Sequence, residues 1–334
     1  MSAIAGCTRP GARADVEGML ARIAHRGPAG RAIHETDAGT LGMAWTRAQA
    51  ASSRILETEQ TAQDHARTGR LAQATIKADG LFLTRDLPGI APLYFARTRD
   101  GTLYFASEVK ALLSFSRDIR CLPPGHHYDG TKLRAFSRLE PQPALVAEPQ
   151  AIARELGSRL ADAVQQALDG NEVGCWLSGG LDSSAMAALA RRQVNTLHTL
   201  LQRVDRCSAA HGILAHVPFL APQVIDYALR IPVALKLHEN TEKWILRQAL
   251  ADLLPLAVLN RPKAKFWAGA GVGDLLTQYA EARIGDDEFE QERTLPNGWV
   301  LHSKEELMYY RIFREHFELA ALSWMGRTKG GPQT

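Results

Sequence analysis

The sequence has few cysteines, no long apolar run and no large excess of charge of either sign. Its four cysteines are Cys7, Cys121, Cys175 and Cys207. None forms a Cys-x-x-Cys pair or has histidines at zinc-ligand spacing, which argues against a structural zinc site and against a disulfide scaffold. No apolar stretch approaches the roughly 20 residues of a membrane helix. The first residues also lack the basic and apolar segments of a signal peptide. We therefore expect a cytoplasmic protein without a membrane segment.

Charge gives no reason to expect a nucleic-acid partner. The 39 basic and 36 acidic residues leave a net charge of +3, and the basic residues are scattered along the chain. A nucleic-acid surface normally needs a clustered basic patch. The hydrophobic fraction of 46% is ordinary for a globular protein, and 334 residues are enough for two domains.

The chain changes character near residue 140. Residues 80–95 read as two short apolar strands around a Pro-Gly turn, and residues 103–107 read as another strand. Residues 137–150 contain Pro141, Pro143 and Pro149 and show little periodicity. We therefore predict a first domain over residues 1–136, a linker over 137–150 and a second domain over 151–334.

The second domain reads as alternating helices and strands. Apolar residues at every fourth position from Ile152 to Leu168 predict a helix that ends at Gly170. Further helices are expected over residues 183–192, 223–230, 242–254 and 304–324, and strands over 173–177 and 197–204. The acidic residues 283–295 are expected to form a loop, and His126-His127 a turn.

The segment Cys175-Trp-Leu-Ser-Gly-Gly-Leu-Asp-Ser-Ser184 carries the chemistry. It lies between a predicted strand and a predicted helix, which is the geometry that binds phosphate groups. Gly179 and Gly180 let the backbone approach an anion, and Ser178, Ser183 and Ser184 add donors. Asp182 is expected to hold a magnesium ion. The alternative is a structural turn with serine as the helix cap. No Walker-type sequence occurs in the chain.

These residues resemble a known family. Ser178–Ser184 is similar to the pyrophosphate loop of the ATP pyrophosphatase superfamily, as found in asparagine synthetases. Other segments resemble that family in the same order along the chain. They are His25-Arg-Gly-Pro28, Arg85-Asp-Leu-Pro-Gly-Ile-Ala-Pro-Leu-Tyr94, Phe105-Ala-Ser-Glu-Val-Lys-Ala-Leu112, Pro124-Gly125, Val204-Asp-Arg206, Ala210-His-Gly212, Val217-Pro-Phe-Leu220, Lys243 with Ile245-Leu-Arg247, and Asn260-Arg-Pro-Lys263.

The resemblance implies a fold of mixed α/β and α+β class. A reduced N-terminal-nucleophile domain, of the class II glutamine amidotransferase type, would precede a truncated ATP-pyrophosphatase (HUP-like) synthetase domain. ATP would bind at Leu177–Ser184 with Mg²⁺ at Asp182. Lys243 stands where the family has a lysine that neutralises charge on the phosphates, an electrostatic role. The alternative for Lys243 is a surface lysine at a helix start.

The sequence departs from the family in the glutaminase half. The family nucleophile is a cysteine at the second position, where this chain has Ser2. An N-terminal serine can itself act as a nucleophile. However, no Asn-Gly-Glu segment and no Gly-Ser-Asp turn occur between Gly42 and Leu81. Without its oxyanion donors, each worth roughly 10²–10³ in rate, glutaminase activity should be negligible. Plain glutamine-dependent asparagine synthesis is thus disfavoured.

A second departure lies in the synthetase half. The chain passes from Thr196–Leu200 almost directly to Val204, without the Ser-Gly-Glu-Gly loop that supplies a second magnesium ligand in the family. Two hypotheses arise. One is an ATP-dependent ligase that adenylates a small-molecule carboxylate, which ammonia or an amine then attacks. The other is a non-catalytic remnant that binds nucleotide or protein. The acceptor stays open, as does whether the chain forms a homo-oligomer or has a partner protein.

Overall fold

The computed structural model describes residues 3–47, 54–56, 61–66, 70–77, 80–137, 142–168, 180–191, 216–261, 274–317, 319 and 322. The chain divides into two compact units. One unit consists of Met1–Phe115 and Cys121–Pro262, and the other of Ser116–Arg120 and Lys263–Thr334. The domain boundaries predicted at residues 136 and 151 lie inside the first unit and stay predictions.

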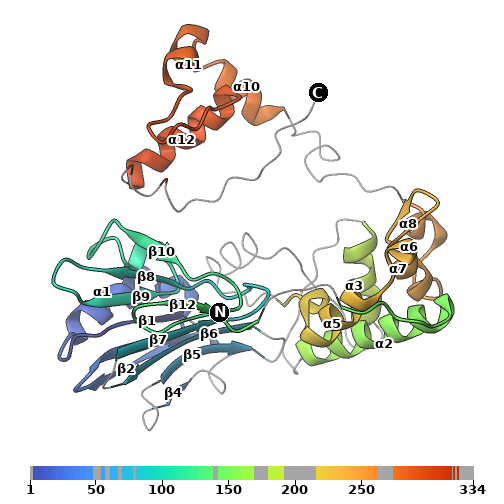
Figure 1. The fold of residues 1–334 in the computed structure, drawn as a ribbon, viewed down its shortest axis with the longest axis horizontal. Helices are drawn as coiled ribbons and strands as arrows, with labels where there is room; N and C mark the ends of the chain where they lie inside the picture. The colour runs from blue at the N-terminus through green and yellow to red at the C-terminus, as the bar shows by residue number, and fades with distance from the viewer. Residues whose placement is uncertain are drawn as a thin grey trace. The chain divides into compact units, whose positions relative to one another are not determined.

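The N-terminal part of the chain contains two six-stranded, largely antiparallel sheets (Figure 1). The first sheet has the order β10-β8-β9-β1-β3-β2, and the second has the order β12-β11-β7-β6-β5-β4. The strands of the first sheet are β1 (Ala3–Cys7), β2 (Gly30–Thr36), β3 (Gly39–Trp45), β8 (Tyr94–Arg97), β9 (Leu103–Ala106) and β10 (Ile119–Cys121). Those of the second are β4 (Arg54–Leu56), β5 (Thr61–Ala66), β6 (Arg70–Lys77), β7 (Gly80–Arg85), β11 (His126–Tyr128) and β12 (Leu133–Ala135).

The two sheets bury a common apolar core. In β7, buried residues alternate with half-buried ones, so that Leu81 and Leu83 enter the core beside Ile4 and Phe105 of the other sheet. This alternation is the period-two pattern of a sheet with one buried face. The helix α1 (Arg13–Arg22) contacts β1 and β3. The first sheet is therefore buried on both faces along these two strands, whose described residues are almost all buried.

The predicted strands around the Pro-Gly turn are confirmed, and two buried charged residues hold the turn between them. Arg85 donates to the carbonyl oxygens of Gly89, Ala91 and Leu122 at 2.7–2.8 Å. Asp86 accepts from the backbone N–H groups of Ile90, Ala91 and Leu71. Because so many backbone groups of the loop are satisfied by these side chains, the Arg-Asp pair of the motif has a structural role.

The histidines at 126 and 127 do not form the turn that we predicted. They begin β11, in which His127 pairs with Thr84 of β7 and with Arg134 of β12. The turn precedes them at Gly125, whose φ of +67° favours glycine. The turn therefore lies at Pro124 and Gly125, two residues before the predicted position.

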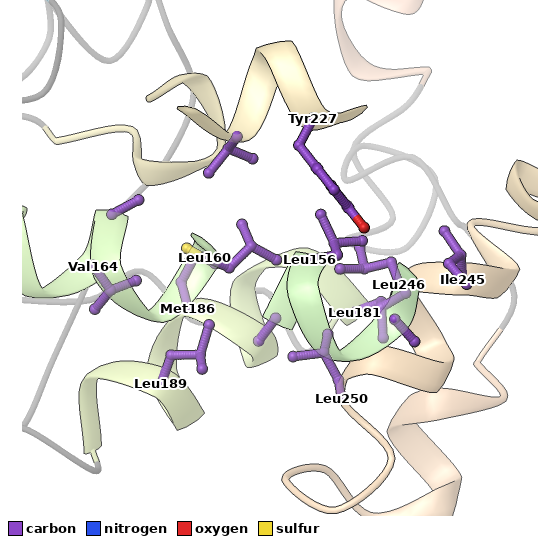
Figure 2. Packing of buried hydrophobic residues seen from close by; sticks show 14 of the residues in the cluster. Leu156, Leu160, Val164, Leu181, Met186, Leu189, Tyr227, Ile245, Leu246 and Leu250 are labelled. Carbon is purple, nitrogen blue, oxygen red and sulfur yellow. The ribbon is translucent and has the colours of Figure 1, made fainter. Parts of the chain in front are cut away.

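The C-terminal part of the first unit is a helical cluster built on α2 (Pro149–Ala167). The other helices are α3 (Leu181–Arg191), α5 (Pro222–Arg230), α6 (Val233–Lys236), α7 (Trp244–Ala249) and α8 (Leu256–Leu259). The apolar face predicted for α2 is confirmed, since Ile152, Leu156, Leu160 and Val164 are all buried. Figure 2 shows this face between residues of α3, α5 and α7. The helix α2 contacts all three, so it fixes their mutual positions.

The second unit contains the helices α10 (Leu275–Glu281), α11 (Asp286–Glu292) and α12 (Lys304–His316). The loop that we predicted over residues 283–295 is wrong, because α11 lies within it. Acidic residues in a first helical turn interact favourably with the helix dipole, and the Glu288 carboxylate accepts from the N–H of Gly285. A short acidic helix shows little apolar periodicity, which explains the error.

The closing helix is shorter than predicted. It ends at His316, because Phe317 has the extended angles φ −132° and ψ 145°. Leu307 is fully buried, whereas Ile312 is 48% exposed. Among the described residues, no helix has the length and apolar character needed to cross a bilayer.

Candidate functional site

The structure describes part of the predicted ATP site. Ser2, Leu177, Ser178 and Gly179 lie outside the described residues. Gly180, Leu181, Asp182, Ser183, Ser184 and Lys243 lie within them. The predicted strand over residues 173–177 and the one over 197–204 also fall outside the described residues. The described portion of the candidate site therefore consists of the start of α3 and the start of α7.

The helix α3 begins at Leu181, directly after the glycines of the loop. Leu181 is buried in the core of the helical cluster, whereas the Asp182 side chain is 47% exposed. The Ser183 hydroxyl donates to the Gly180 carbonyl oxygen at 3.1 Å, and the Ser184 N–H donates to the same oxygen at 3.0 Å. These bonds close the first helical turn, so the N–H of Ser184 is engaged within the helix. Phosphate contacts of Ser183 and Ser184 stay predictions.

Lys243 directly precedes α7 and has a left-handed backbone conformation, with φ 58° and ψ 32°. It follows a small hairpin of β13 (Leu237–His238) and β14 (Thr241–Glu242). The hairpin turn residues Glu239 and Asn240 also have positive φ, at 46° and 62°. Non-glycine residues in this region cost about 1–2 kcal/mol, and a lysine has no side-chain acceptor with which to cap a helix. Local preferences therefore do not explain a lysine here.

The Lys243 ammonium group lies 2.5 Å from a carboxylate oxygen of Asp182, across 61 residues of sequence. Packing on α2 explains how the two side chains meet. Leu181 anchors the start of α3, while Ile245 and Leu246 anchor α7, and all three are buried in one cluster. The charged residues beside these anchors then project from neighbouring helix starts. The structure thus brings together the two residues predicted to handle metal and phosphate charge.

Arg247 holds the backbone on which Lys243 sits. Its guanidinium donates to the carbonyl oxygen of Glu242 at 2.9 Å and to that of Leu259, at the end of α8. The N–H of Arg247 also donates to the Lys243 carbonyl oxygen. Sequence reasoning assigned no role to Arg247. A signal was present only in its spacing from Lys243, which places it one helical turn later.

The residues present fit a magnesium–nucleotide complex. Mg²⁺ in such sites is bound by one or two carboxylates together with phosphate oxygens, and Asp182 supplies one exposed carboxylate. Lys243 would supply a positive charge for the phosphates. Within the described ranges, no group of three or more histidine, cysteine, aspartate or glutamate side chains gathers into a metal site.

The family-like residues of the N-terminal part surround the first strand. The Ser107 hydroxyl accepts from the N–H of Ile4 at 2.9 Å, two residues after Ser2. Arg26 is fully buried and donates to Glu108 at 2.7 Å. The His25 imidazole lies 3.3 Å from the Lys110 ammonium, and burial together with this cation lowers the pKa of His25. Cys7 is buried, as expected for a small apolar residue.

Comparisons with known proteins place these features in a family. The asparagine synthase profile matches residues 155–200 and 194–329, which together are more than half of the chain. A glutamine amidotransferase domain profile matches residues 50–114. The asparagine synthase match comes in two pieces that meet at residues 194–200. That is where the sequence passes from Leu200 towards Val204 without the Ser-Gly-Glu-Gly loop.

The curated relatives are asparagine synthetases. The chain is similar to asparagine synthetase (glutamine-hydrolyzing) of Gallus gallus, at 34% identity over 37% of this chain and 23% of that protein. It is also similar to asparagine synthetase B (glutamine-hydrolyzing) of Escherichia coli, at 34% identity over 39% of this chain and 24% of the relative. Asparagine synthetase (glutamine-hydrolyzing) 3 of Bacillus subtilis is 29% identical over 46% and 25%. The chain thus spans about a quarter of each relative's length.

Among solved structures, the glutamine phosphoribosylpyrophosphate amidotransferase of B. subtilis, complexed with ADP and GMP, aligns with a TM-score of 0.33 and 14% identity. The alignment covers 60% of this chain and 65% of that one. The family profiles confirm the predicted fold class of an N-terminal-nucleophile-type amidotransferase domain, here reduced, followed by an asparagine synthase domain. The chain is a shortened member of the asparagine synthase family.

Proposed function

We propose that the chain binds Mg·ATP between the start of α3 and Lys243, and that it is an amide-forming ligase without glutaminase activity. The reaction would join a small-molecule carboxylate to ammonia or an amine, through an adenylated carboxylate. Asp182 would bind the magnesium ion, and Lys243 would neutralise charge on the phosphates. Residues 177–184 would hold the pyrophosphate portion.

The contact between Lys243 and Asp182 carries this proposal. Two residues from distant sequence motifs meet at 2.5 Å, and one of them has a strained backbone. Strained residues persist where the surrounding structure holds them, and they cluster at functional sites. A solvent-exposed lysine without a functional role would need neither the left-handed backbone conformation nor an acidic partner. The family match over residues 155–329 supports the same role for both residues.

The proposal is tested by thermal unfolding of the purified chain with and without Mg·ATP. Ligand at about 100 times its dissociation constant should stabilise the fold by roughly 2.7 kcal/mol. Asp182→Ala should abolish the shift. Asp226→Ala, an exposed aspartate on α5, is the matched control and should keep it. If the native chain shows no shift, the ATP site is refuted. A shift that persists in Asp182→Ala removes the metal role of Asp182.

A second candidate is a remnant of the family that folds without catalysing a reaction. The two-piece profile match, which breaks where the Ser-Gly-Glu-Gly loop is absent, favours it. Exchange of labelled pyrophosphate into ATP, screened over small carboxylates with ammonia absent, separates the two candidates. Exchange with any carboxylate supports the ligase. Nucleotide binding without exchange across the screen supports a nucleotide-binding remnant, and no binding at all supports a protein-interaction role. Glutamine should not be hydrolysed in any of these cases.

A further inference from the structure

We infer that His238 is a positioning residue for Lys243, and that it holds the hairpin before α7 more firmly when its imidazole is protonated. The inference rests on the proposed nucleotide site and adds a control of that site by pH. Its starting point is the contact between the rings of His238 and Trp244, whose centroids lie 4.7 Å apart with 42° between the ring planes. This contact joins β13 to the first residue of α7.

The hairpin of β13 and β14 is a strained segment with little internal support. In the described part of the chain, the non-glycine residues with positive φ are Glu239, Asn240 and Lys243, which lie within five residues of one another. Strained residues persist only when the surrounding structure holds them. The two strands pair over just two residues each, and an isolated hairpin is at best marginally stable. Contacts with the helices must therefore hold this one.

The two strands of the hairpin are held in different ways. Arg247 bonds to a carbonyl oxygen at the end of β14. In β13, Leu237 is 53% exposed, whereas the ring of His238 lies on Trp244. Trp244 in turn packs against the apolar core around α2. Because Lys243 directly follows β14, the placement of its ammonium group depends on both anchors.

One carboxylate lies close to the His238 imidazole. An oxygen of Glu239 is 3.9 Å from Nε2 of His238. The other charged residues on the neighbouring elements form no hydrogen bond or ion pair with the imidazole in the described structure. They are Lys236 at the end of α6, Glu242 in β14, Lys243 before α7 and Arg247 in α7. A proton on the ring would therefore meet one carboxylate at close range.

Protonation strengthens both contacts of the ring. Histidine is the side chain whose charge ordinarily changes between pH 5 and 8. An imidazolium attracts the Glu239 carboxylate, and a cation within about 6 Å of an indole ring is attracted to its face. The neutral ring keeps only the stack on Trp244. Since His238 and Glu239 are 45% and 86% exposed, we expect a gain of only about two- to fivefold in affinity for Mg·ATP.

The test is isothermal titration calorimetry of Mg·ATP between pH 6 and 8, with the native chain and His238→Phe. Phenylalanine keeps a ring that can stack on Trp244 but carries no charge. The ratio of the two affinities removes the titration of ATP itself, and it should fall about two- to fivefold from pH 6 to pH 8. His238→Ala should bind more weakly than His238→Phe throughout. His302→Phe, at an exposed histidine before α12, is the control and should reproduce the native profile.

A ratio that stays constant across this range overturns the inference and leaves the nucleotide site intact. A similar fall in the ratio of native to His302→Phe affinities also overturns it, because the effect would not depend on the hairpin. If no chain binds Mg·ATP at any pH, the proposed function fails. Hydrogen exchange of residues 237–243 then decides, since their protection, corrected for intrinsic rates, should be greater at pH 6 than at pH 8 in the native chain alone. Equal protection in native and His238→Phe chains would refute the role of His238.

Discussion

Arg26 and Glu108 form a buried ion pair that joins two motifs separated by 82 residues of sequence. The guanidinium is fully buried and donates to the carboxylate at 2.7 Å. One residue belongs to the segment His25-Arg-Gly-Pro28 and the other to Phe105-Ala-Ser-Glu108. Both segments surround the beginning of β1. The pair therefore links these two segments beside the first sheet.

Glu108→Ala should destabilise the fold strongly. The substitution leaves the buried Arg26 charge without this carboxylate, and removing one partner of a buried ion pair typically costs about 3–5 kcal/mol. The measurement is urea unfolding followed by circular dichroism. Replacement of both residues, as Arg26→Met with Glu108→Leu, should cost less than Glu108→Ala alone. A single substitution that costs under about 1 kcal/mol would contradict the structural role of the pair.

Asp86→Asn tests the carboxylate that holds the Pro-Gly turn. Its two carboxylate oxygens accept hydrogen bonds from three backbone N–H groups. Asparagine has an NH₂ group in place of one oxygen, and this donor would face backbone donors. We expect a loss of about 1–3 kcal/mol in unfolding free energy. Asp118→Asn, whose side chain is 59% exposed, is the control and should stay within about 0.5 kcal/mol of the native chain.

The same variant reveals a pH dependence. Burial raises the pKa of Asp86 above its ordinary value of 3.8, although the three N–H groups act in the opposite direction. Between the unfolded and the raised folded pKa, the folded state binds more protons, so stability falls as pH rises. The advantage of the native chain over Asp86→Asn should therefore shrink as pH increases from below about 4. Urea midpoints across this range would measure it, and a growing advantage would show that the N–H groups dominate.

Lys243→Gly should separate stability from binding. Glycine adopts the left-handed conformation without strain, which offsets the loss of an exposed ion pair and the greater freedom of the unfolded chain. Unfolding free energy should stay within about 1 kcal/mol of the native value, while the stabilisation by Mg·ATP disappears. Lys236→Gly, at the end of α6, should keep that stabilisation. A loss above about 2 kcal/mol would mean that Lys243 is a structural residue.

Arg311→Gln tests the acidic helix of the second unit. Arg311 donates to Glu288 and Glu292 at 2.7 Å, and its guanidinium lowers the pKa of Glu288. A lowered pKa contributes stability at neutral pH that is lost as pH falls through the folded value. We expect faster amide hydrogen exchange in α11 of the variant at pH 7, with Arg314→Gln as the control. Equal exchange in native and variant chains would show that α11 does not depend on these pairs.

Sequence patterns predicted the parts of this chain in which one physical rule dominates. The apolar run before the Pro-Gly turn predicted β7, and the apolar repeat from Ile152 to Leu168 predicted α2. The acidic helix α11 was missed because Phe289 is its one apolar residue, which gives no repeat, whereas its contacts with Arg311 depend on the fold. The turn predicted at His126 is wrong because this residue pairs with Ala135 in the sheet, and the turn lies before it.

In the candidate site, the sequence identified the residues but not their contact or their backbone conformation. Asp182 could be identified from its position after two glycines, and Lys243 from its resemblance to a family lysine. Their mutual contact could not be predicted, because it depends on packing of α3 and α7 against α2. Nor does any local pattern predict the left-handed backbone of Lys243, since lysine is a poor choice for it. Residues that violate local preferences are visible only once the backbone is known.

The strained position of Lys243 has a consequence for protein design. A sequence-design procedure that optimised stability on this backbone would place glycine or asparagine at residue 243, because these residues suit positive φ. This substitution would remove the ammonium group that pairs with Asp182 in the described part of the chain. Any redesign of this chain should therefore retain Lys243, together with Arg247, which supports the backbone beside it.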